Sequence, residues 1–284
     1  ITQPENRYYL SGFNGSAGYL LVSEKKAILA TDFRYTEQAL NQAPDYEILR
    51  IANSISDWFP GLLKDIGIKR LGFEAESVTF DMHRKLHKAL FPGHLSSMPY
   101  IGKPTIKPGL KPGDSTIEFR LKKGGTAGGP AGVELVPVSG IVEKLREVKE
   151  AEEIDLIRKA VEIADIAYTK VAGTIEAGMT EKQIAWELEK ALRDNGSEAI
   201  PFEIIVASGP NAALPHAQPS AREIRDGDAI VIDMGARIDG YCADLTRTIV
   251  IGEPPPLFRE RYNTVLAANV AALSGIRAGM IGRE

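Results

Sequence analysis

The sequence predicts an α+β protein with two folded units and a segment that links them. Over residues 1–98, short β-rich apolar runs alternate with helical segments, as in an α/β domain. Residues 149–284 begin with amphipathic helices and continue into a β-hairpin. Residues 99–132 hold eight of the 27 glycines together with several prolines. We therefore expect an insertion or flexible linker at 99–132, followed by a connector at 133–148.

The composition excludes several classes of protein. The chain has 284 residues, of which 44% are hydrophobic and 25% charged, as in a soluble globular protein. A net charge of −4 without a long basic run argues against nucleic acid as a partner. Cys242 is the only cysteine, which excludes an internal disulfide and favours a reducing, cytoplasmic location. No apolar run reaches membrane-span length, so we expect no membrane partner. The chain opens at Ile1 without a signal-peptide pattern, as if its start were trimmed.

Local signals predict each element of the first unit. Residues 19–22 and 27–30 flank a polar turn and form a hairpin. A helix follows residues 31–35 and has Glu37 in its first turn. The remaining predictions are a strand at 46–51, a helix at 55–66, a strand at 70–74 and a helix at 80–90.

Helical spacing is clearest in the second unit. A helix is predicted over residues 152–171, with its apolar face formed by Ile154, Ile157, Val161 and Ala164. Thr180 and Gln183 form a capping box that opens a second helix, which ends at Asn195–Gly196. The apolar face of this second helix consists of Ile184, Leu188 and Leu192. A strand at 202–207 and a helix at 258–273 complete the unit.

The segment 229–250 carries most of the chemical information. Two β-rich runs flank Asp239–Gly240, a strong hairpin signal. Either register that this turn allows puts Asp233 and Asp244 on one face, directly opposite or diagonal, with Thr246 beside them. Two like charges this close repel each other unless a cation neutralises them, and hard divalent cations take carboxylate oxygens. The alternative is that these aspartates cap a turn or face water.

Histidines add a second candidate. His216 lies in a loop between two prolines, which restrict its backbone. A lone loop histidine usually faces solvent, but a restricted backbone suits a positioned donor or ligand. His83 and His87 stand at i and i+4 and could bind a metal. Lysines surround them and no acidic partner is near, so we expect a solvated helix face instead.

A short internal repeat indicates duplication. Residues 175–179 read IEAGM and residues 276–280 read IRAGM, each just after a predicted helix. We therefore expect two related half-domains, of which the second is mostly absent from the chain.

Several segments together resemble one known family. PENRYYLSGFNGSAGYLL and ATDFRYTEQA are similar to the N-terminal domain of the creatinase, prolidase and aminopeptidase P group of metallopeptidases. IVASGPNAALPHAQPS and VIDMGARIDGYCADLTRT resemble the first half of the pita-bread catalytic domain of that group. The resemblance implies a creatinase-like α/β domain followed by the first part of a pita-bread domain.

The resemblance also implies a dinuclear site with two divalent metal ions, Mn²⁺ in the first place and Co²⁺ or Zn²⁺ as alternatives. Asp233 would be a bidentate or bridging-side ligand and Asp244 the carboxylate that bridges both ions. His216 would be the catalytic hydrogen-bond donor or proton shuttle, and Thr246 would orient a ligand. The family further uses one His and two Glu ligands from its C-terminal half. No histidine follows His216, so we expect the chain to be inactive by itself.

The function that follows is a metal-dependent Xaa-Pro peptidase of the dipeptidase or aminopeptidase P type. Its substrate would be a proline-containing peptide, and the family implies a homodimer. Two alternatives stay open: a non-proteolytic pita-bread module that binds peptides or proteins, and a creatinase-type C–N hydrolase. The joint presence of His216, Asp233 and Asp244 favours an enzyme over a binding module.

Overall fold

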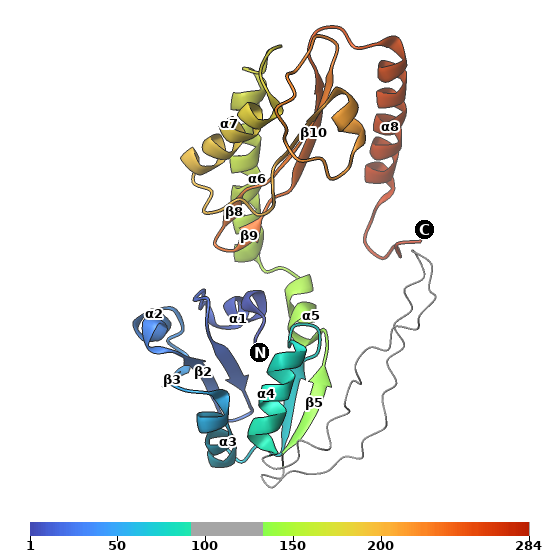
Figure 1. The fold of residues 1–284 in the computed structure, drawn as a ribbon. Helices are drawn as coiled ribbons and strands as arrows, with labels where there is room; N and C mark the ends of the chain where they lie inside the picture. Colours follow the sequence, from blue (N-terminus) through green and yellow to red (C-terminus); the bar gives the residue numbers. More distant parts are fainter. Residues whose placement is uncertain (92–132, 284) are drawn as a thin grey trace, which may run out of the picture. The chain divides into compact units, whose positions relative to one another are not determined.

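The computed structural model describes residues 1–91 and 133–283 (Figure 1). They form two compact units, Ile1–Val148 and Lys149–Glu284. The predicted linker at 99–132 lies outside the described residues. The segment 133–148, expected to be a connector, forms β5 (Glu134–Val138) and α5 (Ile141–Glu147) and belongs to the first unit.

The first unit is built from two small sheets and their covering helices. Strands β1 (Tyr19–Val22) and β2 (Ala27–Thr31) form the predicted hairpin, and β3 (Glu47–Arg50) pairs parallel to β2. Strand β4 (Arg70–Glu74) pairs parallel to β5. The helices are α1 (Pro4–Ser11), the 3₁₀ helix η1 (Phe33–Tyr35), α2 (Thr36–Gln42), α3 (Ile55–Asp65) and α4 (Phe80–Leu90).

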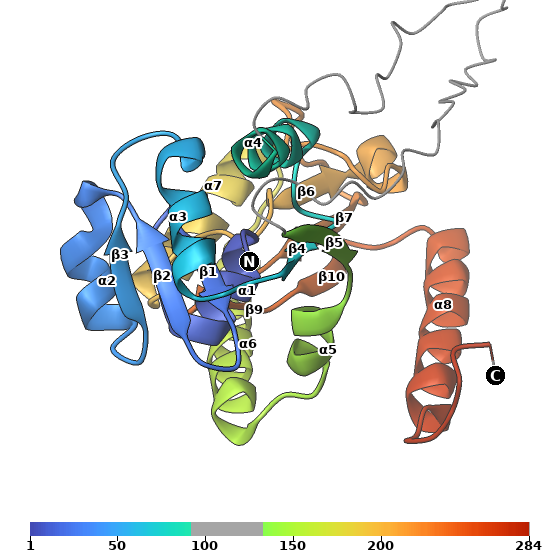
Figure 2. The same cartoon turned by 90° about the horizontal axis from the view of Figure 1, so that it is seen from below.

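The predicted elements of this unit are confirmed to within a residue or two at their ends, whereas α1 was not predicted. Helices α3 and α4 pack side by side (Figures 1 and 2). Their buried side chains include Phe59, Leu63, Leu86 and Leu90, which join the strand residue Leu71 in one core. A second core lies around Phe13, Leu20 and Leu29.

The second unit places two helices on one face of a three-stranded antiparallel sheet. The sheet has the order β10 (Leu245–Val250), β7 (Ala229–Met234), β6 (Ile205–Ser208). Helices α6 (Ala151–Ala172) and α7 (Glu181–Asp194) cover the face that carries Ile230, Ile232 and Met234 (Figure 1). The hairpin tip consists of β8 (Arg237–Ile238) and β9 (Tyr241–Cys242). The other elements are η3 (Gly209–Ala213) and α8 (Pro256–Gly275).

Strand alternation fixes which face of the sheet is open. Along β7, Ile230, Ile232 and Met234 are buried, whereas Val231 and Asp233 are half-buried. Ile232 and its neighbours belong to the core that α6 and α7 close. Asp233 therefore projects from the opposite face of the sheet, away from this hydrophobic core.

Helices α6 and α7 are both confirmed, but the buried face of α6 differs from its apolar spacing. The capping box at Thr180 and Gln183 is present, and Ile184, Leu188 and Leu192 are fully buried. In α6 the buried side chains are Ala160, Ala164, Ala167 and Val171. Of the four apolar positions that predicted this helix, Ala164 is buried and Ile157 half-buried, whereas Ile154 and Val161 are 38% and 43% exposed. The buried face is therefore rotated from the apolar one, because α6 packs mainly through small side chains that let the helix approach its neighbours closely.

The repeated pentapeptides adopt the same turn. Met179 N donates to Glu176 O at 3.3 Å, and Met280 N donates to Arg277 O at the same distance. Gly178 and Gly279 have φ of 95° and 91°. This local match is what a duplication requires, and the duplication stays a prediction. None of the described helices is both long and apolar enough to cross a lipid bilayer.

Candidate active site

The hairpin register places the two predicted ligands on one side of the sheet. Asp233 pairs with Thr246 across β7 and β10, and β8 and β9 continue the same register to the turn. Asp244 precedes Thr246 by two residues, so by strand alternation it lies diagonally from Asp233 on the same side. Of the two registers that the sequence allowed, the structure has the diagonal one. Asp239 and Gly240 at the turn have φ of 45° and 80°, as a type I′ turn requires.

Thr246 orients the first of these carboxylates. Its Oγ1 donates a hydrogen bond to Asp233 Oδ1 at 2.9 Å. Asp233 is half-buried and Asp244 is exposed. The pair is thus accessible from solvent on the face of the sheet that α6 and α7 leave open.

The donor set fits part of a divalent-metal site. Carboxylate oxygens are hard donors that suit Mn²⁺ and similar ions. Within residues 1–91 and 133–283, no group of three or more His, Cys, Asp or Glu side chains gathers closely enough to hold a metal ion. Asp233 and Asp244 therefore fit one side of a coordination shell and do not close it.

His216 occupies a well-defined turn in the loop after β6. Ala217 N donates to Leu214 O at 3.2 Å, which closes a β-turn with Pro215 and His216 at its centre. Ala217 is buried and His216 is exposed. The structure thus holds the His216 backbone as the prolines led us to expect. It does not gather His216 with Asp233 and Asp244 into a three-ligand group of the described residues.

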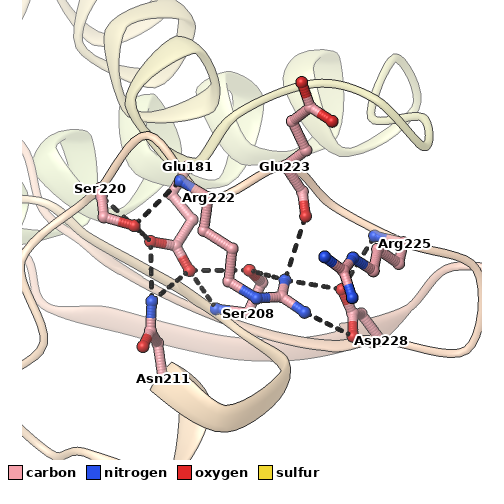
Figure 3. A network of polar contacts seen from close by, with 8 residues as sticks. All are labelled: Glu181, Ser208, Asn211, Ser220, Arg222, Glu223, Arg225 and Asp228. Atoms are coloured by element: carbon pink, nitrogen blue, oxygen red, sulfur yellow. Dashed lines mark hydrogen bonds and ion pairs between the residues drawn. The ribbon is translucent and has the colours of Figure 1, made fainter.

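A polar network that the sequence did not reveal supports this loop (Figure 3). Its centre is Glu181, the first residue of α7, whose exposed fraction is 0%. Oε1 of Glu181 accepts from Ser208 N and Ser208 Oγ, both at 2.7 Å. Oε2 accepts from Ser220 N at 3.0 Å and from Ser220 Oγ at 2.6 Å. Asn211 Nδ2 donates to both oxygens, at 3.1 and 3.2 Å.

An ion pair continues the network toward β7. Arg222 binds Asp228 through two parallel contacts, Nη1 to Oδ2 at 2.7 Å and Nη2 to Oδ1 at 3.0 Å. Arg222 Nη1 also donates to Ser208 Oγ at 2.6 Å. Ser208 thus accepts from Arg222 and donates to Glu181, which joins the carboxylate to the ion pair. Asp228 directly precedes β7, the strand that carries Asp233.

These contacts change the acidity of the two carboxyl groups. Burial alone would raise the pKa of Glu181, but the hydrogen bonds from Ser220 and Ser208 outweigh it and lower that pKa to about 2. The hydrogen bond from Arg222 lowers the pKa of Asp228. Both groups are therefore ionised at neutral pH.

The sequence held only a partial signal for this network. The capping box placed Glu181 in the first turn of α7, where a carboxylate is favoured by the helix dipole. Its partners Ser208 and Ser220 lie 27 and 39 residues further along the chain. No local pattern indicates a contact at that separation.

The histidine pair on α4 is not solvated to the extent expected. His83 and His87 are half-buried and their rings lie 6.5 Å apart. His87 stacks on Phe91 at 4.5 Å, and His83 lies 5.2 Å from the ring of Phe73. The pair belongs to a row of aromatic contacts rather than to a metal site of the described residues.

Comparison with family models identifies the class of protein. Residues 155–284 match the metallopeptidase family M24, and residues 1–100 match the creatinase/prolidase N-terminal domain. Both matches agree with the two units of the structure. The chain belongs to metallopeptidase family M24, with a creatinase/prolidase N-terminal domain before its pita-bread catalytic domain.

Individual relatives agree with this assignment. The chain is 34% identical over its whole length to the uncharacterized peptidase YqhT of Bacillus subtilis and covers 69% of that protein. It is 31% identical to an Xaa-Pro dipeptidase of Pyrococcus horikoshii and covers 68% of it. Among solved structures, the Xaa-Pro dipeptidase from Bacillus anthracis has a TM-score of 0.82 at 36% identity, with 99% of this chain and 68% of that chain covered. The X-Pro aminopeptidase from Thermotoga maritima has a TM-score of 0.78 at 32% identity, with 99% and 70% covered.

Proposed function

We propose that this chain provides the first two metal ligands and the catalytic histidine of an Xaa-Pro peptidase with a dinuclear metal site. The observation that supports the proposal is the register of the hairpin, in which Asp233 pairs with Thr246, two residues after Asp244. From strand alternation we infer that both carboxylates lie on one face. The names of two similar proteins, an Xaa-Pro dipeptidase and an X-Pro aminopeptidase, support the substrate class.

Each residue has a distinct task. The carboxylates of Asp233 and Asp244 hold the divalent ions, for which Mn²⁺ is the first candidate. When bound, such ions supply an activated water and polarise the scissile carbonyl. Thr246 fixes the rotation of the Asp233 carboxylate through its hydrogen bond. His216 donates a hydrogen bond to the carbonyl oxygen as negative charge develops on it.

A metal-based site suits the chemistry of the X–Pro bond. This bond is a tertiary amide without an N–H, and the proline ring fixes φ. Enzymes that bind substrate as an added β-strand need the missing N–H for pairing. Recognition through the carbonyl oxygen does not depend on that hydrogen.

The 284-residue chain alone should bind metal weakly and should not hydrolyse peptides. Two carboxylates leave most of a coordination shell to water, and no third potential ligand gathers with them among the described residues. The expected homodimer is also a proposal, tested by sedimentation for a mass twice 30.9 kDa. A reducing, cytoplasmic setting is supported by the single cysteine, which is exposed and unpaired.

Metal binding by the chain tests the site directly. Calorimetric titration with Mn²⁺ should show weak binding that Asp233→Asn and Asp244→Asn each abolish. Asp239→Asn is the matched control, because this aspartate lies on the same hairpin but at its turn. Binding that survives in both site variants, or that Asp239→Asn removes equally, would refute the site.

The substrate specificity is tested in a longer protein, which contains these residues and is as long as the relatives. With Mn²⁺ we expect hydrolysis of Ala-Pro, little hydrolysis of Ala-Ala and none of creatine. Asp233→Asn and His216→Ala should remove the activity on Ala-Pro. Preference for Ala-Ala would reject the Xaa-Pro assignment, and turnover of creatine would favour the C–N hydrolase. Turnover of Ala-Pro by the 284-residue chain that depends on Asp233 would contradict the inactivity we expect of it.

A further inference from the structure

The loop that carries His216 is fixed at both ends by a single buried carboxylate. Ser208 ends β6 just before the loop, and Ser220 follows it. Glu181 binds the backbone N–H and the hydroxyl of both serines, so its two oxygens hold the two ends together. His216 lies between these anchors, four residues before Ser220.

The backbone around Glu181 strengthens the same connection. Glu181 N donates to Arg222 O and Lys182 N donates to Ser220 O, each at 3.1 Å. The start of α7 thus binds the end of the loop through backbone as well as side-chain contacts. Asn211, inside the loop, adds two further hydrogen bonds from its Nδ2 to the same carboxylate.

The other side of the network fixes the loop relative to β7. Arg222 connects Ser208 to Asp228, which directly precedes that strand. Gly209 lies against this ion pair with φ of 50°, and a Cβ there would stand 2.5 Å from Arg222 Nη2 and 2.7 Å from Asp228 Oδ1. The packing leaves no room for a side chain, so the start of the loop is closely fitted to the base of β7.

We infer that Glu181 is a positioning residue, which sets the place of His216 relative to the Asp233–Asp244 face. The inference rests on the proposed function, because it gives the His216 loop a task at the metal site. The hydrogen bonds of the Glu181 side chain within the described residues go to the loop and its ends, not to the aspartates. Glu181 acts only by holding the loop, and Ser208, Asn211 and Ser220 are the groups through which it does so (Figure 3).

A purely structural cap of α7 is the competing explanation. Thr180 already caps this helix through a hydrogen bond from Gln183 N, and Gln183 completes the capping box. The side chain of Glu181 is instead directed at donors of the loop. A cap would stabilise α7, whereas a clamp would order residues 209–219 and hold His216 at a set distance from a metal ion on Asp233.

Two measurements on the 284-residue chain separate these roles. Hydrogen exchange reports the order of the loop through the Leu214 and Ala217 amides, which bond within it. Paramagnetic broadening by added Mn²⁺ reports how close the His216 imidazole lies to the ion, with Asp233→Asn as the blank. A His216→Ala spectrum assigns the signal among the four histidines.

In Glu181→Gln we expect faster exchange of the loop amides and a severalfold loss of the Asp233-dependent broadening at His216. Glu187→Gln, an exposed glutamate on the same helix, should change neither. Ser220→Ala keeps the charge of Glu181 and should produce smaller changes in the same direction. If Glu181→Gln does not fold, the loop exchange and the broadening measured in Ser220→Ala decide whether Glu181 positions His216.

Three results would contradict the positioning role of Glu181, each in a different way. Unchanged loop exchange in Glu181→Gln and Ser220→Ala overturns the clamp. Faster exchange with undiminished broadening overturns the positioning role and leaves only a structural one. Absence of Asp233-dependent broadening in the unaltered chain, with faster exchange in the variants, overturns the proposed metal site and with it the task assigned to Glu181.

Discussion

The buried carboxylate of Glu181 makes the stability of the second unit depend on pH in a predictable way. Its pKa is about 2 in the folded chain against an ordinary value of 4.5. A depressed pKa contributes stability above the unfolded value, and that stability is lost as pH falls toward the folded value. The contribution of Glu181 should therefore be complete above about pH 6 and decline between about pH 5 and pH 2.

The magnitude follows from the same values. The lowered pKa corresponds to roughly 3 kcal/mol at neutral pH, taking about 1.4 kcal/mol for each tenfold change in proton affinity. Glu181→Gln removes the charge and turns one acceptor oxygen into an NH₂ group that faces the donors of Ser220 or Ser208. We expect a loss of about 2 to 4 kcal/mol, because unpaired buried donors add to the lost charge-assisted bonds.

Urea denaturation of the chain and of Glu181→Gln at pH 7, 5 and 3 measures this loss. Unfolding of the second unit must be followed separately, since two units need not unfold together. Both proteins therefore carry Trp58→Phe, which removes the tryptophan of the first unit and leaves the fluorescence of Trp186. The difference between the two proteins should shrink by about 1 to 2 kcal/mol from pH 7 to pH 3. Glu187→Gln should show no such trend. A difference of constant size at all three pH values would refute the lowered pKa of Glu181, and no difference at pH 7 would refute its structural role.

Three other substitutions test neighbouring parts of the site. Gly209→Ala should destabilise the second unit by about 1 to 3 kcal/mol in a urea melt, because the residue has a positive φ and its Cβ would meet Arg222; a change below experimental error would contradict the close fit. Thr246→Val should weaken Mn²⁺ binding about tenfold in a calorimetric titration, because Asp233 loses the hydrogen bond that orients it; unaltered affinity would remove Thr246 from the site. Without metal, Asp244→Asn should change stability by less than about 0.5 kcal/mol, since the residue is exposed. With Mn²⁺ only the unaltered chain should gain thermal stability, and an equal gain in Asp244→Asn would show that the ion binds elsewhere.

Local signals were sufficient for most elements, and their failures have physical causes. Strands β1, β2 and β4 and helices α4 and α7 were predicted from periodicity, turns and caps, which act within a few residues. In α6 the large residues Ile154 and Val161 suggested the buried face, but alanines form it. A prediction from hydrophobic periodicity relies mainly on large apolar side chains, whereas a helix that packs closely against its neighbours buries small ones. Helix α1 was missed because its apolar periodicity is weak and its buried side chains include the polar Asn6 and Arg7.

Part of the candidate site could be predicted from neighbouring residues, and part depends on contacts between residues far apart in the sequence. A turn and the two-residue period of strands limited the hairpin to two registers, so Asp233 and Asp244 could be placed on one face without coordinates. Which of the two registers is present depends on the whole pairing of β7 with β10. The support of His216 depends on Glu181 contacts across 27 to 39 residues, which no window of sequence contains.

The two faces of the second sheet show why the acidic pair points to function and not to stability. One face is closed by α6 and α7 over Ile230 and Ile232, and this core accounts for the folding of the unit. An antiparallel sheet commonly leaves its other face in water, so the exposure of that face alone carries no information. Two carboxylates placed diagonally on it repel each other and add nothing to the core. Glu181, in contrast, is fully buried and gains enough donors to offset its desolvation. The buried contacts of Glu181 order the loop of His216, whereas the two carboxylates add unfavourable charge to an open face, which agrees with the metal site proposed for that face.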